Sequence, residues 1–160
     1  MLRNFVYPIK KLLRILDGDT IDAQIDLGYS TFVEKRIRFM GIDTPEKRTK
    51  NLVEKKHGYA ATNFLTEQLG YKKCPTCKQG VDGEQKVKII SHGLGKYGRV
   101  LGELFIESEE TEDTDININE QMIQLGYAYQ YEGGRKLSYQ QVLEMFPAMQ
   151  NRANEINRGE

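Results

Sequence analysis

The clearest pattern along the chain is an alternation of apolar and polar residues in its first quarter. From Ile21 to Leu27 every second residue is apolar, which is the period of a strand with one buried face. Gly28 to Ser30 predicts a turn, and Phe32 to Met40 predicts the returning strand. On that strand Ile37 shares a face with Phe39, and the intervening residues face the other way. The pattern therefore predicts a hairpin near the start of the fold.

Further apolar segments predict the rest of the elements. The other expected strands are Leu12–Leu16, Val87–Ile90 and Val100–Ile106. Apolar residues at helical spacing predict helices over 54–69, over Asn117–Leu125 and from Ser138 onward. Pro147 lies inside the apolar stripe of the last helix, where it should kink the helix or delay its start. Five strands and three helices predict an α+β protein.

The organisation indicates one domain over residues 1–160. A chain of 160 residues is long enough to bury one core, and we find neither a repeat nor a second apolar cluster. Residues 71–84 and 107–115 interrupt the regular elements, and their polar composition predicts two inserted surface loops. The second loop holds six carboxylates and no basic residue, without the glycine and spacing of an EF-hand. We expect it to be solvated.

The formal net charge of zero hides an asymmetry. Residues 1–106 hold 19 Lys and Arg against 12 Asp and Glu, whereas residues 107–160 hold 4 against 11. The positive part can steer a polyanion even though the whole chain is neutral. The chain has no apolar run long enough to span a membrane and no visible secretory signal. We expect a cytoplasmic monomer; removal of a processed signal is the alternative.

Two acidic motifs are candidates for metal and water chemistry. Asp17-Gly18-Asp19-Thr20 links the first two strands, and Asp43-Thr44-Pro45-Glu46 follows the third. Each motif alone is compatible with a simple tight turn. Together they offer two carboxylates, Asp19 and Asp43, for a hard cation such as calcium, which prefers oxygen ligands. Glu46 would then remain to hold a water molecule as a general base or a positioning group.

Two arginines complete a set suited to phosphodiester chemistry. Arg38 lies five residues before Asp43, and Arg99 ends the motif Lys96-Tyr97-Gly98-Arg99 before the last strand. A lone arginine on a strand is usually a solvated charge, and the second motif alone reads as a hairpin turn. A planar guanidinium can hold two oxygens of one phosphate, which a lysine cannot do.

These motifs, in this order, resemble those of the staphylococcal (micrococcal) nuclease family, from about Leu12 to about Tyr131. The resemblance implies a five-stranded OB-fold β-barrel with three helices. It also implies calcium-dependent hydrolysis of DNA and RNA that leaves 3′-phosphates. The roles it implies are metal binding for Asp19, Asp43 and Thr44, catalysis for Arg38, Glu46 and Arg99, and substrate binding for Lys96, Tyr97, Tyr129 and Tyr131.

The sequence departs from the family at Cys74 and Cys77, which lie in the first inserted loop. The pair could be inert thiols or half of a structural zinc site. Zinc would need His57 and His92, or the same pair from a second chain, to complete four ligands. We interpret the pair as inert.

The sequence therefore favours a calcium-dependent nuclease that acts on DNA, RNA or both. A catalytically silent OB-fold module that binds nucleic acid or protein is the main alternative, and a zinc-assembled structural protein is a third. A binding module has no need of Asp19, Asp43 and Glu46, so their presence together favours the enzyme.

Overall fold

The computed structural model describes residues 5–76, 80 and 85–159. Its strands are β1 (Phe5–Asp17), β2 (Thr20–Asp26), β3 (Phe32–Phe39), β4 (Ile42–Asp43), β5 (Val87–Leu94), β6 (Val100–Ile106), β7 (Ile116–Asn117) and β8 (Tyr129–Gln130). Its α-helices are α1 (Leu52–Gln68), α2 (Ile118–Gln124), α3 (Tyr139–Met145) and α4 (Pro147–Arg158). None of these helices is long and apolar enough to span a bilayer.

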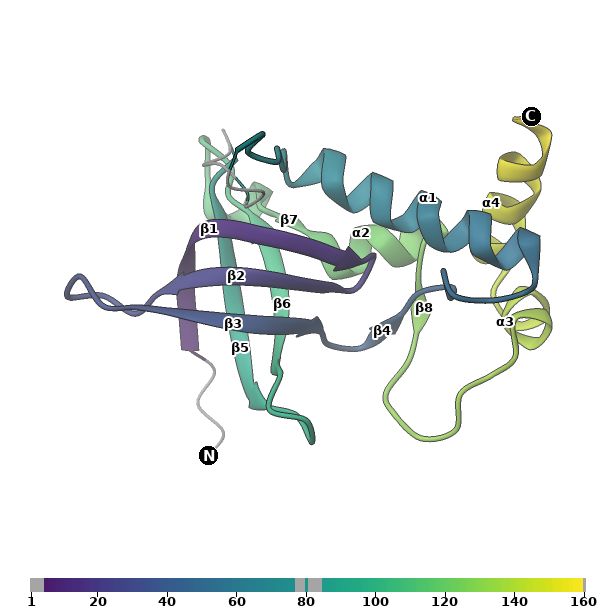
Figure 1. Ribbon diagram of the computed structural model, residues 1–160, viewed down its shortest axis with the longest axis horizontal. Coiled ribbons are helices and arrows are strands. Elements are labelled where there is room, and N and C mark those ends of the chain that lie inside the picture. Colours follow the sequence, from purple (N-terminus) through teal and green to yellow (C-terminus); the bar gives the residue numbers. More distant parts are fainter. Residues whose placement is uncertain (1–4, 77–79, 81–84, 160) are drawn as a thin grey trace.

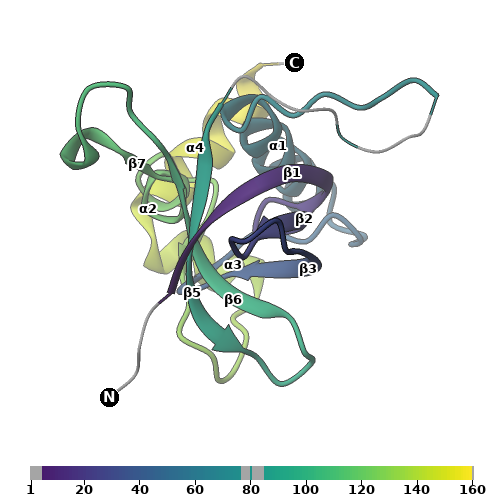
Figure 2. The same ribbon diagram turned by 90° about the vertical axis from the view of Figure 1, so that its left-hand side faces the viewer.

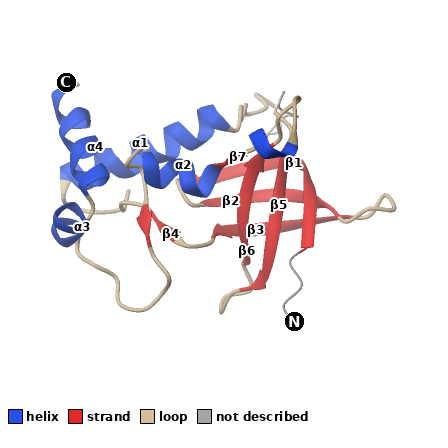
Figure 3. Ribbon diagram, turned by 180° about the vertical axis from the view of Figure 1, so that it is seen from behind, coloured by secondary structure: helices blue, strands red, loops and turns tan. Residues whose placement is uncertain are grey.

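The long strands close into a barrel. Strands β3, β2, β1, β5 and β6 pair in that order, and β3 returns to β6 through a short parallel pairing. That pairing joins Ile37 to Val100 and Phe39 to Gly102. The long strands occupy one end of the molecule, whereas the short strands β4 and β8 lie beside the helices toward the other end (Figures 1 and 3). The expected α+β fold, with a five-stranded OB-fold barrel, is confirmed.

Alternation along the strands builds the core as predicted. Ile21, Ile37 and Phe39 are all fully buried, and Arg36 and Arg38 lie on the outer face of β3. Helix α1 closes one end of the barrel with Ala61 and Leu65, and Figure 2 shows α1 and α4 behind the strands. The outer face of β3 is therefore free to carry chemistry.

The predicted number of helices, three, is wrong. Pro147 ends the expected C-terminal helix, so that α3 stops at Met145 and α4 begins at Pro147 itself. Proline lacks the N–H that a continuing helix needs, but it suits the first turn of a new one. Ser138 caps α3 as expected, through the backbone N–H of Gln141. The proline therefore delays a second helix rather than kinking a single one.

The two inserted loops differ in how they are held. In the first, Lys73 pairs with Gly80, and Cys77 lies outside the described residues. In the second, the side chain of Asp115 is 2.6 Å from Lys88 Nζ. The contact with Lys88 lowers the pKa of Asp115, helped by the backbone N–H of Ser108. The acidic loop is thus anchored to β5 instead of being wholly solvated.

Asn119 fastens α2 to the barrel. Its side chain is buried, accepts a hydrogen bond from the N–H of Leu104 and donates to the carbonyls of Met40 and Gly102. Buried backbone groups need such partners. The side chain therefore fixes the chain at the exit of β3, three residues before Asp43.

His57 joins three helical segments. It is fully buried on α1, with Nε2 at 2.7 Å from the carbonyl of Gly126 and Nδ1 at 2.9 Å from the hydroxyl of Tyr139. The carbonyl can only accept, so Nε2 carries the proton and Nδ1 accepts from Tyr139. Burial lowers the pKa of His57, against the hydrogen bond to Gly126, and the charge of Arg152 lowers it further.

We expect the stabilising effect of His57 to fade in acid. Its folded-state pKa lies below the unfolded value of about 6.5, so the neutral ring stabilises the fold above that pH. Replacing it by glutamine should cost roughly 2–4 kcal/mol near neutrality. Thermal melts of the wild type and His57→Gln from about pH 7.5 to about pH 5 should converge as the pH falls. A gap that widens in acid would contradict the buried neutral ring.

Candidate active site

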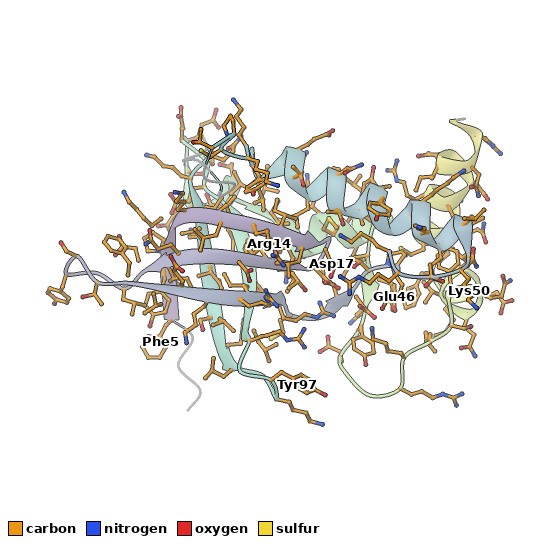
Figure 4. The ribbon with its side chains drawn as sticks, in the orientation of Figure 1. Phe5, Arg14, Asp17, Glu46, Lys50 and Tyr97 are labelled. Carbon is orange, nitrogen blue, oxygen red and sulfur yellow. The ribbon has the colours of Figure 1, made fainter. Side chains whose placement is uncertain are left out.

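Three segments far apart in the sequence line one cavity beside the barrel. They are the β1–β2 turn, the segment that starts at β4 and the β5–β6 hairpin. Figure 4 shows Asp17, Glu46 and Tyr97, one from each. A cavity of about 410 Å³ lies between them. The predicted site residues that line it are Asp19, Arg38, Asp43, Thr44, Glu46, Tyr97, Arg99 and Tyr131.

The first segment is shaped by the approach of α1. A Cβ atom added to Gly18 would lie 2.9 Å from Cβ of Ala61, so only glycine lets the helix come this close. Beside it, Thr20 donates to Oδ1 of Asp19 at 2.9 Å, and the N–H of Phe39 donates to the Asp19 carbonyl. The position and orientation of Asp19 are therefore set by the turn, the neighbouring strand and the helix together.

Arg38 lies between the two expected metal carboxylates. Its Nη1 is 3.0 Å from Oδ2 of Asp19, and its Nη2 is 3.3 Å from Oδ1 of Asp43. Both carboxylates are buried. Burial raises the pKa of Asp19 to about 6, because the attraction of Arg38 only partly offsets the loss of water and Asp43 adds repulsion. The carboxylates of Asp19 and Asp43 are thus held close together, and the positive charge of Arg38 between them offsets their mutual repulsion.

Asp43 is further held by Tyr129. The tyrosine hydroxyl donates to Oδ2 of Asp43 at 2.8 Å, and the N–H of Thr44 donates to Oδ1. Burial raises the pKa of Tyr129, and so does the charge of Asp43, so the phenol remains a donor. Tyr129 is buried against Phe146, with ring centroids 5.4 Å apart, and does not line the cavity of about 410 Å³. The structure therefore places it behind the carboxylate, whereas Tyr131 faces the cavity.

Glu46 has a partner that the sequence analysis missed. Its exposed carboxylate is 3.2 Å from Lys136 Nζ, which also lies 3.5 Å from Oδ2 of Asp43. Partial burial of the ammonium opposes its charge, but the attraction of both carboxylates outweighs this and raises the pKa of Lys136. Lys136 lies 90 residues after Glu46, in a loop without a recognisable motif, so only the fold reveals the contact. The lysine extends the row of cations begun by Arg38.

The β5–β6 hairpin supplies the second arginine and an exposed aromatic ring. The guanidinium of Arg99 lies 5.6 Å from the ring centre of Tyr97, which is exposed. Lys96 does not line the acidic cavity but a neighbouring, more apolar one of about 320 Å³. Leu101 and Tyr131 also line this second cavity, which could hold a planar apolar group beside the charged site.

The donor atoms at the first cavity suit a hard cation. Asp19, Asp43 and Thr44 offer only oxygen, and two buried carboxylates close together benefit from a positive ion. Among the described residues no group of three or more His, Cys, Asp and Glu is arranged around a common metal position. The fit therefore rests on two carboxylates, with backbone and water oxygens completing the shell.

The alternative zinc site finds no support from His57. Both of its ring nitrogens are engaged, with Tyr139 and with the Gly126 carbonyl. Cys74 lies in its loop with Sγ at 3.2 Å from the hydroxyl of Thr76. A site that combines His57 with the cysteine pair would have to break the buried contacts between the helices.

Comparison with known sequences gives the family. The sequence model described as staphylococcal nuclease homologue matches residues 36–159, most of the chain. The chain belongs to the staphylococcal nuclease family. It is 31% identical to a thermonuclease of Staphylococcus intermedius, over 60% of this chain and 48% of that protein.

The other relatives differ in the share of their own length that matches this chain. An uncharacterized protein of Bacillus anthracis is 32% identical over 73% of this chain and 44% of its own length. Endonuclease YhcR of Bacillus subtilis is 28% identical over 74% of this chain, but only 8% of its own length. The chain spans about half the length of the first curated relatives it matches. Family membership and the relatives named as nucleases support a nuclease-type function.

Proposed function

We propose that this protein is a calcium-dependent nuclease that cleaves the 5′-O–P bond of DNA, RNA or both and leaves 3′-phosphates. The observation that carries the proposal is the arrangement around Arg38. Its guanidinium bridges the buried carboxylates Asp19 and Asp43 at a cavity that Glu46 and Arg99 also line. A module that only binds nucleic acid has no use for paired buried carboxylates, because they repel a polyanion.

Asp19, Asp43 and the backbone carbonyl of Thr44 are the residues that would hold calcium. When bound, the ion would act as a Lewis acid toward a phosphate oxygen. Two hydrogen bonds orient these carboxylates. The hydroxyl of Tyr129 donates to Asp43, and the hydroxyl of Thr44 donates to Oδ2 of Asp19 at 3.2 Å. These contacts fix the carboxylates before any ligand arrives, which lowers the cost of binding.

The remaining groups account for the chemistry on the phosphate. Arg38 and Arg99 hold its non-bridging oxygens and offset the charge that develops as water adds to phosphorus. Glu46 holds that water and takes one of its protons, while the bond to the 5′-oxygen breaks and the leaving oxygen takes a proton from solvent. The products are a 3′-phosphate and a 5′-hydroxyl, so the atoms balance with water as the only co-reactant.

Digestion of single-stranded DNA and RNA tests the proposal. Cleavage should occur with calcium and stop with a chelator, zinc should not replace calcium, and end analysis should find 3′-phosphates. Cleavage that continues in chelator would reject the calcium site. Binding without cleavage in calcium would support the silent module instead.

Lys136 gives a separate prediction about the ion. Its ammonium lies beside Asp43 and Glu46, so it repels a cation held by the same carboxylates. We expect Lys136→Gln to tighten calcium binding by roughly three- to tenfold, since one exposed charge at this range is worth about 1 kcal/mol. Titration calorimetry measures the effect without substrate, and Arg135→Gln, one residue away, serves as the control. Weaker calcium binding in Lys136→Gln would show that the lysine organises the site rather than opposing the ion.

A further inference from the structure

A third cavity, an open charged groove, lies next to the proposed active site on the outer face of the barrel. It has a volume of about 640 Å³ and is lined by Asp22, Arg36, Tyr97, Gly98 and Arg99. Tyr97 and Arg99 line the first cavity as well, so the two spaces adjoin at these residues. The proposed hydrolysis uses Arg99, and the family resemblance implies substrate binding by Tyr97, which leaves Asp22 and Arg36 without an assigned role.

The position of Arg36 follows from strand register. Arg36 and Arg38 lie two residues apart on the same face of β3, about 6.6 Å along the strand. The parallel pairing of Ile37 with Val100 puts Arg36 level with Arg99, the residue before Val100. A guanidinium next to the proposed phosphate clamp is therefore a consequence of barrel closure.

Asp22 holds the guanidinium of Arg36 in a fixed orientation. Nε of Arg36 donates to Oδ1 at 2.7 Å and Nη2 donates to Oδ2 at 3.0 Å. The remaining nitrogen, Nη1, takes part in neither bond, and the arginine side chain is 45% exposed. A two-pronged contact of this kind orients the arginine while it leaves donors for another anion.

The row of charges across the sheet remains positive. Asp22 stands opposite Arg36 on β3 and opposite Arg14 on β1, and residues paired across strands share a face. This row across the three strands therefore holds two arginines and one carboxylate. Tyr97 adds an exposed ring at the rim of the groove, on which a nucleobase can stack.

We propose that this groove binds the phosphate next to the scissile one in single-stranded nucleic acid, with Arg36 as its contact and Asp22 as the residue that orients it. The proposal rests on the proposed nuclease function and extends it from one phosphate to a path along the substrate. It implies that longer substrates gain affinity that a dinucleotide cannot gain.

The test compares two neighbouring residues of β3. Arg36→Gln and Lys35→Gln remove the same charge, but Lys35 lies on the opposite face and lines none of the three cavities. Fluorescence anisotropy in chelator would measure the binding of a labelled oligothymidylate. We expect Arg36→Gln to raise Kd about fivefold at low salt and to reduce the salt slope by about 0.7, the value for one single-strand phosphate. Lys35→Gln should stay near the wild type.

Cleavage assays separate this subsite from the catalytic centre. Arg36→Gln should lower kcat/KM for the oligothymidylate and leave kcat/KM for a thymidine dinucleotide unchanged. Arg36→Lys should restore most of the binding, because a lysine still carries charge to a phosphate even though it loses the double contact with Asp22.

Three results would overturn the inference. Equal effects of Arg36→Gln and Lys35→Gln would mean general attraction, and equal losses on both substrates would place Arg36 in the catalytic centre or in the fold. If the wild type cleaves DNA and one of these two results is found, the phosphate subsite is rejected and the proposed nuclease function stands. A wild type that neither binds nor cleaves would reject the proposed function together with it.

Discussion

Glu46→Gln is expected to lower the turnover number on single-stranded DNA by about 10²- to 10⁴-fold, the range for a positioned acid–base group. Glutamine keeps the shape of the side chain but cannot take a proton from water. It also loses the ion pair with Lys136, at 3.2 Å, so the side chain is held less firmly. Oligonucleotide affinity should change far less than turnover, because the proposed mechanism assigns Glu46 to the attacking water and not to the phosphate oxygens.

The comparison needs a glutamate outside the cavity. Glu67 is exposed on α1 and lines none of the described cavities, so Glu67→Gln should cleave like the wild type. Initial rates at saturating substrate, with anisotropy for binding, give both quantities. Near-normal turnover of Glu46→Gln would remove Glu46 from the mechanism. The proposed hydrolysis would then have no residue assigned to take the proton from water.

Arg99→Lys should lower turnover by about 10²- to 10³-fold, the cost of one donor to the developing charge. Lysine keeps the charge but loses the planar two-pronged contact with phosphate. Arg48→Lys makes the same change at an exposed residue outside the described cavities and should have little effect. Similar small losses for both variants would mean that Arg99 only attracts the substrate.

Arg38→Lys differs from Arg99→Lys in its effect on stability. Arg38 bridges two buried carboxylates, and one ammonium cannot reproduce both contacts. Its loss should lower the melting temperature as well as turnover. Arg99 contacts the exposed ring of Tyr97, so its replacement should leave the melting temperature nearly unchanged. Calorimetry on the two variants therefore separates the two roles.

The long strands were predictable because the pattern that defines them is local, whereas their closure into a barrel was implied by the family resemblance and depends on the distant pairing of β3 with β6. Alternation of apolar residues from Ile21 to Leu27 and from Phe32 to Met40 defines which face is buried, and a slip by one residue would expose the core. The strand Val100–Ile106 was located to the residue. The first strand was predicted too short, since its outer part from Phe5 carries exposed apolar residues that break the alternation.

The parts that were missed depend on tertiary contacts. Lys136 reaches Glu46 only because the loop after β8 passes the cavity, and nothing near either residue signals this. Tyr129 and Tyr131 are alike in sequence, two residues apart in one short motif. Packing against Phe146 turns the first into a support for Asp43, whereas the second remains at the cavity. Periodicity cannot distinguish two such tyrosines.

The packing of Tyr129 on Phe146 has a consequence for truncated forms. The ring that holds Asp43 is covered by the residue between α3 and α4, and Tyr139 of α3 supplies a hydrogen bond to His57. A deletion of these two helices would leave every proposed catalytic residue in place, yet uncover Tyr129 and strip the buried imidazole of a partner. We expect such a fragment to lose the proposed activity even though it keeps all the proposed catalytic residues. We therefore expect the smallest fragment with the proposed activity to extend beyond Phe146, well past Lys136, the last residue in the sequence that lines the cavity.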